Sequence, residues 1–330
     1  MIDLFRRLHP FNLLWLVLVL AALRIGVMLH LPGRLNYNLV EPFLTLQLPF
    51  RIQYIFEPIE NFLCATLITL ILAIWLNKLV TDHNLMGKPN FMAALMLVVC
   101  SGLFLPFTIM SRPLMANFFL LWMCMRVFQL YRSEEAKSIA YDLGLIVALG
   151  TLVYFPFLFM LIAVWAALAV FRPFSWREWV AVPIGFFTVF FFIAVLAYWN
   201  DRFDDFYRIW LPLKTIPVAN FHLTTYTYIL LLPVAVIVFL SFIHLREHFF
   251  KTSVFVRKVY QWLMILFVVG AASYYVQDQY KVTHFLLCIV PAAVIMAVYF
   301  SSSAIRWMYE SLFVILVGVL LYFQYSNLLP

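Results

Sequence analysis

The chain consists of long apolar segments separated by short polar ones, and the apolar segments carry no polar stripe. Residues 11–31, FNLLWLVLVLAALRIGVMLHL, are apolar on every helical face. Runs of about 18 or more apolar residues are typical of helices that cross a bilayer, whereas the strands of membrane barrels alternate apolar and polar positions. Backbone groups in lipid need partners within their own segment, so this pattern predicts spanning helices.

The same pattern predicts an all-α, polytopic membrane protein with a single transmembrane domain over residues 1–330. We expect about 11 transmembrane helices, with the N-terminus in the cytoplasm and the C-terminus outside. The expected location is the bacterial inner (cytoplasmic) membrane. The predicted spans are 11–31, 59–77, 91–109, 114–131, 139–153, 156–171, 179–199, 226–244, 259–276, 283–300 and 307–325.

The fifth and sixth spans share one apolar run, and the charges indicate how it is divided. Pro156 interrupts the run, because proline removes a helical hydrogen bond and clashes with the preceding turn. Two helices joined there put 14 of the 22 Lys and Arg residues on the cytoplasmic side, including those of RPFSWRE (172–178) and LREHFFKTSVFVRK (245–258). One long kinked helix would put both basic loops outside, so the positive-inside rule favours the broken pair.

The composition excludes a soluble protein. Of the residues, 66% are hydrophobic and only 11% are charged, and no water-soluble fold of this length buries that much apolar surface. The net charge of +7 lies beside the predicted spans, as the positive-inside rule requires, so no nucleic-acid partner is expected. The cysteines lie in apolar segments without metal-like spacing, and we expect them to be small buried residues: Cys64, Cys100, Cys124 and Cys288.

Two segments on the expected outer face are longer than simple connections. Residues 32–58 mix aromatic residues, prolines and charges, and part of this loop is apolar enough to lie in the interface as an amphipathic helix. Residues 200–225 are also aromatic and charged. The sequence has no Walker A, H-E-x-x-H, G-x-S-x-G or Cys/His metal pattern, which removes the usual support for ATPases, zinc proteases and serine hydrolases.

Few ionisable residues lie within the predicted spans, and such residues are functional candidates by default. Arg24 lies in the outer third of the first span, and the alternative to a binding role is that its side chain snorkels to the outer face. Arg126 and Asp142 lie near the cytoplasmic ends of their spans, where we expect snorkelling, or pairing with Arg132 or Lys137. The spans contain no series of Asp, Glu and His residues, which weighs against a proton-driven pump.

The expected outer face carries residue types that suit chemistry on a lipid diphosphate. Carboxylates act as general bases or hold divalent metals, and Arg and Lys bind phosphate groups. The candidate catalytic residues are Glu41 and Glu57, and the candidate substrate-binding residues are Arg24, Arg112, Asp201, Asp204, Lys281 and His284. The alternative is that these are only the polar residues that any outer loop needs, above all in the DRFDD cluster (201–205).

Three segments resemble the GT-C superfamily of multispan glycosyltransferases, which use polyprenyl-phosphate sugar donors. They are GTLVYFPFLFMLIAVWAALAVFRPFSWREW (150–179), YKVTHFLLCIVPAAVIMAVY (280–299) and SRPLMANFFLLW (111–122). Each joins an outer turn to a helix in the way that family does. The chain also resembles a group of bacterial inner-membrane proteins with no assigned activity.

The GT-C resemblance implies an enzyme that transfers a sugar or related group from a polyprenyl-phosphate carrier at the outer face. The family has an acidic residue early in the first outer loop, as base or metal ligand, and here the nearest is Glu41, then Glu57. Arg112, Lys281 and His284 would bind the phosphate, and a divalent cation is the cofactor that this chemistry would use. Membrane lipid, the carrier and a membrane protein are the expected partners. Two alternatives stay open: a non-catalytic subunit of a larger membrane complex, and a lipid or polyisoprenoid transporter.

Overall fold

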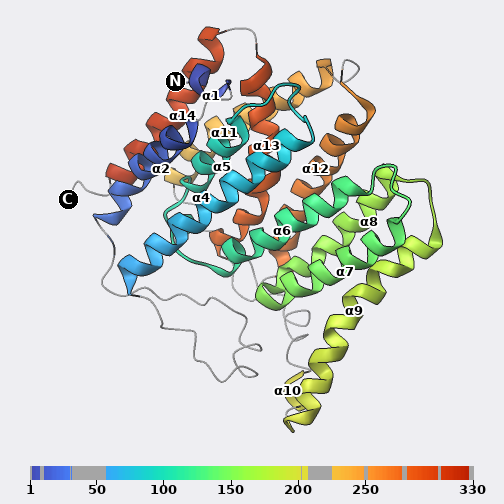
Figure 1. Cartoon of the computed structure of the whole chain (residues 1–330). Coiled ribbons are helices and arrows are strands. Elements are labelled where there is room, and N and C mark those ends of the chain that lie inside the picture. The colour runs from blue at the N-terminus through green and yellow to red at the C-terminus, as the bar shows by residue number, and fades with distance from the viewer. Residues whose placement is uncertain are drawn as a thin grey trace.

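A computed structural model shows how the segments are arranged (Figure 1). It describes residues 2–7, 11–29, 31, 57–201, 203–206, 225–248, 252–276, 281–303 and 306–326, and within these ranges every regular element is a helix. The α-helices are α1 (Ile2–Phe5), α2 (Asn12–Met28), α4 (Pro58–Asp82), α5 (Met92–Ser101), α6 (Arg112–Gln129), α7 (Ala136–Val153), α8 (Met160–Phe171), α9 (Trp176–Trp199), α10 (Phe203–Phe206), α11 (Thr225–His248), α12 (Val254–Ala272), α13 (Leu286–Ser302) and α14 (Arg306–Ser326). Short 3-10 helices are η2 (Leu105–Thr108), η3 (Phe155–Phe159), η6 (Ser273–Val276) and η7 (Val282–Phe285).

Helices occupy most of the predicted spans, and the chain has the character of a membrane protein. Within the described ranges, five helices are long and apolar enough to cross a bilayer: Pro58–Asp82, Ala136–Val153, Trp176–Trp199, Val254–Val276 and Val282–Ser302. Shorter apolar helices lie over Asn12–Met28, Met92–Ser101, Phe155–Phe171 and Leu231–Arg246. The all-helical fold and the membrane character are therefore confirmed.

The third predicted span, 91–109, is not one helix. The helix α5 ends at Ser101, Phe104 is extended, and η2 then starts with Pro106 in its first turn. Pro106 lacks the N–H that a continuous helix would need at this position, and it lies in the first turn of η2 instead. With ten residues, α5 is about 15 Å long, or half of a typical hydrocarbon core. All ten residues are buried, and α5 packs against α13 at the centre of the bundle.

The broken pair over 139–171 is confirmed. Tyr154 is extended and separates α7 from η3 and α8. The chain then turns back, and the guanidinium of Arg172, just after α8, donates to the main-chain oxygen of Ser133, just before α7. At the turn, the ring of Phe157 fills the space beside Gly150. The two helices therefore form a hairpin.

Helix α9 lies against α7 through two glycines. A methyl group at Gly144 would lie less than 3.0 Å from the carbonyl oxygen of Val182, and one at Gly185 would lie equally close to the carbonyl oxygen of Tyr141. Small residues allow helix backbones to approach closely in a membrane. Beyond this crossing, α9 continues past the bundle to α10 (Figure 1).

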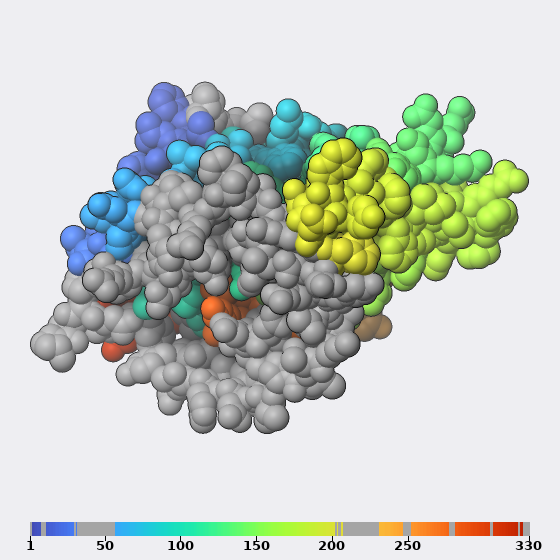
Figure 2. Space-filling view, turned by 90° about the horizontal axis from the view of Figure 1, so that it is seen from below, coloured from blue at the N-terminus to red at the C-terminus, as the bar shows by residue number. Residues whose placement is uncertain are grey.

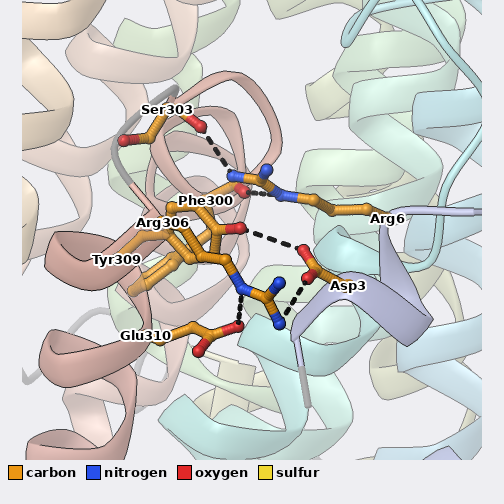
Figure 3. Close-up of polar contacts among 7 residues, drawn as sticks. All are labelled: Asp3, Arg6, Phe300, Ser303, Arg306, Tyr309 and Glu310. Carbon is orange, nitrogen blue, oxygen red and sulfur yellow. Dashed lines mark hydrogen bonds and ion pairs between the residues drawn. The ribbon is translucent and has the colours of Figure 1, made fainter.

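The two ends of the bundle have different polar networks. At one end, which we call the Arg6 end, the guanidinium of Arg6 donates from Nε to the Phe300 oxygen (2.8 Å) and from Nη2 to the Ser303 oxygen (2.9 Å) (Figure 3). These carbonyls belong to the last turn of α13, which has no helical partners for them. The main-chain N–H of Phe91 also donates to the Phe5 oxygen there.

Helices α2 and α14 lie side by side and run in the same direction. At the Arg6 end, Arg306 pairs with Asp3 at 3.3 Å. At the other end, the Tyr325 ring lies beside Gly26. The first and last long helices of the chain are therefore neighbours in the bundle.

The polar residues within the spans also differ from expectation. Arg126 pairs with Asp142 at 3.1 Å, which joins α6 to α7, and the expected partners Arg132 and Lys137 are not used. Helix packing decides this pairing, because the two residues lie far apart along the chain. The cysteines are free, and Cys100, Cys124 and Cys288 are buried as expected, whereas Cys64 is half-buried.

Candidate functional site

The candidate site lies at the end opposite Arg6, which we call the Arg24 end. Here the C-terminal part of α2 meets the start of α4, the η2 segment, and the starts of α6 and α13. Figure 2 shows this face. Teal and orange atoms, from the middle and late parts of the chain, lie deep between the blue atoms of α2 and α4 and the yellow atoms of α9 and α10.

Arg24 joins three elements at this end. Its Nη1 donates to Thr66 Oγ1 (3.0 Å) and to the main-chain oxygen of Thr108 (3.1 Å), and its Nη2 donates to Thr69 Oγ1 (2.9 Å). The threonines lie one turn apart on α4, and Thr108 ends η2. The residue is only 2% exposed, so the alternative to a binding role, that its side chain snorkels to the outer face, does not hold.

The charge of Arg24 has no acidic partner among the described residues. Its hydrogen-bond acceptors are two hydroxyls and one carbonyl, all of them neutral, and its Nε is buried without a partner. A guanidinium has five N–H groups, and its edges match two oxygens of a carboxylate or phosphate. A buried arginine in lipid costs several kcal/mol unless it is paired, so this cation is suited to an anion.

A second buried donor lies beside the same segment. Asn61, on α4, is fully buried, and its Oδ1 accepts from the main-chain N–H of Met110 (2.9 Å). Its Nδ2 has no partner, and the hydroxyl of Ser111, the next residue after Met110, has none either. Three buried polar atoms in or beside residues 108–111 thus have no hydrogen-bond partner: Arg24 Nε, Asn61 Nδ2 and Ser111 Oγ. Buried polar groups normally have partners, so these atoms indicate a place for a ligand or water.

Glu57 has a role in local structure. It is the N-cap of α4, and its side chain accepts from the Glu60 N–H while the Glu60 carboxylate accepts from the Glu57 N–H (3.2 Å). Such a reciprocal capping box satisfies two of the free N–H groups at a helix start. Pro58 follows at the first helical position, which suits proline. The Glu57-Pro58 pair is therefore a helix-start signal.

His284 is held inside the protein. Its Nε2 lies 2.8 Å from the Gly270 oxygen and 3.2 Å from Ser273 Oγ, and its Nδ1 lies 2.7 Å from the Tyr154 hydroxyl. A neutral imidazole with its proton on Nε2 satisfies these contacts, because a carbonyl only accepts. The residue is 0% exposed. It joins the ends of α7 and α12 to the start of η7.

The other predicted residues are more scattered. Arg112 is the first residue of α6, next to Ser111, and Lys281 is exposed just before η7. Asp201 is exposed after α9, where its φ is +53°. Asp204 lies in α10, with its side chain outside the described part, and Glu41 lies wholly outside the described residues. Among those described, no three His, Cys, Asp or Glu side chains are grouped to hold a metal ion.

No sequence signal marks the partners of Arg24. Thr66 and Thr69 are ordinary residues of an apolar helix, and Thr108 lies in a segment predicted to be helix. Helical spacing places Thr66 and Thr69 on one side of α4, but only the packing of α2 beside that side brings Arg24 to them.

Comparison with known families adds one finding. A family model matches residues 43–329, most of the chain. The chain belongs to the family of unknown function DUF6427. In this DUF6427 chain the match includes the α4 and η2 partners of Arg24, whereas Arg24 and Glu41 precede it. No curated protein and no solved structure matches the chain.

Proposed function

We propose that this chain binds a phosphate-bearing membrane lipid at the Arg24 end. The observation that carries the proposal is the buried guanidinium of Arg24, which has neutral partners and an unused Nε. Lipid headgroups are the anions available at the edge of a bilayer. The Thr108 carbonyl accepts from one N–H of the Arg24 guanidinium, and a phosphate oxygen would replace this carbonyl as the acceptor. Hydrogen bonds between charged groups are about twice as strong as those between neutral groups.

The proposed topology puts this end outside. Eleven crossings of a bacterial inner membrane, with the N-terminus in and the C-terminus out, are supported by the parallel course of α2 and α14. The basic loops supply a second argument. At the Arg6 end, Arg172 donates to the Ser133 oxygen and Lys258 donates to the Phe171 oxygen, and basic residues are enriched on the cytoplasmic side.

The proposed reaction is GT-C-like transfer of a sugar or related group from a polyprenyl-phosphate carrier. The acceptor hydroxyl would give its proton to Glu41 and bond to the sugar carbon, and the phosphate would leave on the lipid. Arg24 would hold that phosphate, and Arg112 and Lys281 lie at the starts of neighbouring elements.

Lipid binding is tested by native mass spectrometry of the full chain extracted in mild detergent with polyprenyl phosphate. We expect Arg24→Gln to lower the amount of retained phosphate lipid by about tenfold or more. Arg24→Lys should retain part of the lipid, because lysine keeps the positive charge but cannot form the bidentate hydrogen bonds of arginine. Arg126→Gln, at the Arg6 end, is the matched control and should retain the lipid fully. A folded Arg24→Gln protein that binds as well as wild type would overturn the proposal.

Transfer is tested separately from binding. Glu41→Gln should abolish transfer to an acceptor while the polyprenyl phosphate is still retained. If neither the wild type nor the variant transfers a sugar but both retain the lipid, the chain binds the carrier without being the transferase.

The subunit hypothesis has one observation of its own. In the apolar stretch of α9 only 28% of the residues are buried, against 83% in that of Val282–Ser302. Helix α9 exposes Phe187, Phe191 and Trp199. An aromatic helix at the edge of a bundle suits a partner helix as well as lipid. Stoichiometric co-purification of one membrane protein, lost when Phe187 and Phe191 are changed to Leu, would support this alternative.

A further inference from the structure

Two buried polar groups at the Arg24 end have no role in the function proposed above. The first is the amide of Asn61, whose side chain is 0% exposed and whose Nδ2 has no partner. Its orientation is fixed, because Oδ1 accepts from the Met110 N–H (2.9 Å) and an N–H can only donate. Buried donors normally have partners, so Nδ2 is placed to donate to a ligand.

The second group is the hydroxyl of Ser111, at the N-cap position of α6. Serine at this position normally accepts from the N–H of the second or third helical residue. Here the second residue is Pro113, which has no N–H, and the Ser111 side chain makes no capping hydrogen bond. Its Oγ is buried without a partner. The hydroxyl can therefore donate to a ligand beside the N-terminus of an 18-residue helix.

Asn61 and Arg24 contact the same short segment. Arg24 donates to the Thr108 oxygen, and Asn61 accepts from the Met110 N–H. Ile109 between them is extended, so the two contacts are about 6.5 Å apart along the chain. One phosphate group bridges such a gap, because it accepts hydrogen bonds of about 2.8 Å on each of its sides.

The three unpartnered donors match a phosphate monoester in number. They are Arg24 Nε, Asn61 Nδ2 and Ser111 Oγ. A monoester has three terminal oxygens, whereas the diester of an ordinary phospholipid has two. The third oxygen is the feature of a monoester that extra donors can recognise.

The charge at this end also suits a monoester. The guanidinium of Arg24 carries one full charge, the N-terminus of α6 adds about half a charge, and Arg112 is the first residue of that helix. A monoester carries about −1.5 to −2 at neutral pH, and a diester carries one negative charge. Glu57 and Glu60, the acids nearest to Asn61 along α4, are exposed and accept from each other's N–H groups.

We propose that the lipid at the Arg24 end is bound as a phosphate monoester and that Asn61 and Ser111 select it. The inference rests on the phosphate-lipid site proposed above. The third oxygen accepts from Asn61 Nδ2 and Ser111 Oγ. In the proposed transfer, this oxygen keeps the electron pair when its bond to the sugar carbon breaks, so the same donors stabilise the phosphate as it leaves on the lipid.

The test compares polyprenyl phosphate with its methyl ester, a diester that has the same tail. Equal amounts of the two lipids are added to the full chain in mild detergent, and retained lipid is measured by native mass spectrometry. We expect the wild type to retain about tenfold more of the monoester. Ser111→Ala should lower this preference by about fivefold, the effect of one hydrogen bond, and should fold normally because no cap is lost.

Asn61→Asp is the second variant. It keeps an oxygen that accepts from the Met110 N–H but replaces the donor by a second carboxylate oxygen, so the preference should disappear. Asn77→Asp is the matched control, because Asn77 is also buried on α4, 16 residues or about 24 Å further along the helix. It should keep the wild-type preference. Arg24→Gln should lower retention of both lipids.

The possible outcomes separate this inference from the proposed function. Equal retention of the two lipids by the wild type would overturn the inference and leave the phosphate-lipid site at Arg24 in place. Retention of neither lipid would overturn both. A wild-type preference that persists in the folded Ser111→Ala and Asn61→Asp proteins would also overturn the inference, since other residues would then select the monoester. If Asn61→Asp does not fold, Ser111→Ala decides alone.

Discussion

The guanidinium of Arg6 lies 3.9 Å from the centre of the Tyr309 ring, so the first helix of the chain is fixed to the last (Figure 3). Asp3 strengthens this contact, because its carboxylate accepts from the Tyr309 hydroxyl (2.9 Å) and pairs with Arg306 (3.3 Å). Arg306 also pairs with Glu310 at 3.0 Å. The network therefore joins α1 to α14, which are about 300 residues apart along the chain.

Replacing Arg6 by Ala should destabilise the protein by about 1–3 kcal/mol. The change removes two hydrogen bonds to the carbonyls of α13 and the cation–π contact with Tyr309. Equilibrium unfolding in mixed micelles measures the loss. Arg7→Ala is the control, because Arg7 is exposed, and it should change stability by less than about 0.5 kcal/mol. Equal effects of the two changes would show that the network contributes nothing specific.

The crossing of α7 and α9 should not tolerate a methyl group. Gly144→Ala places a carbon against the Val182 carbonyl, and rigid backbone cannot give way as a flexible side chain does. We expect a loss of about 1–3 kcal/mol, the usual cost of overpacking. Gly318→Ala, in α14, meets nothing within 4 Å and should be neutral or slightly stabilising, because alanine favours helix. If Gly144→Ala proved as harmless as Gly318→Ala, the close contact of α7 and α9 would be wrong.

The helices could be predicted well from the sequence because a segment in lipid must form its backbone hydrogen bonds within itself, so a long apolar run is a helix. Pro156 even marked the turn of the α7–α8 hairpin, and the basic loops supported it. The end of α5 was missed, since residues 102–109 are as apolar as a helix and hydropathy does not distinguish a 3-10 turn from a span.

The candidate site was predictable only in part. Arg24 was found because a charge in a span is rare, but its partners Thr66 and Thr108 depend on packing between helices. Glu57 and His284 were chosen for their chemistry, and both have structural contacts that no single-residue argument reveals. Arg126 and Asp142 form a pair for the same reason, as neighbours in space and not in sequence.

The capping box of α4 separates the structural role of Glu57 from the catalytic one. Glu57→Ala removes the acceptor for the Glu60 N–H and should cost about 0.5–2 kcal/mol of stability. Glu57→Asp keeps a good N-cap acceptor and should be nearly neutral. Thermal unfolding of the detergent-solubilised variants measures both. If Glu57→Asp keeps full stability, as expected, but abolishes sugar transfer, Glu57 is a catalytic residue, as the sequence suggested.

The contacts of His284 predict that it stabilises the ends of α7 and α12. Changing His284 to Phe removes the donor to the Gly270 oxygen and the acceptor for the Tyr154 hydroxyl, which leaves the buried hydroxyl without this partner. The expected loss is about 1–3 kcal/mol. Tyr154→Phe should lose a similar amount, and the double variant should lose less than the sum, because the two residues share one hydrogen bond.

The control for these variants is Tyr275→Phe, since that ring is 67% exposed and its hydroxyl should contribute little. Retention of polyprenyl phosphate, measured well below the unfolding temperature, distinguishes a structural role from phosphate binding. A structural His284 lowers the unfolding temperature and leaves retention unchanged. A His284→Phe protein with normal stability that no longer retains the lipid would instead support the ligand role predicted from the sequence, and it would mean that the imidazole leaves Tyr154 and Gly270 when the lipid binds.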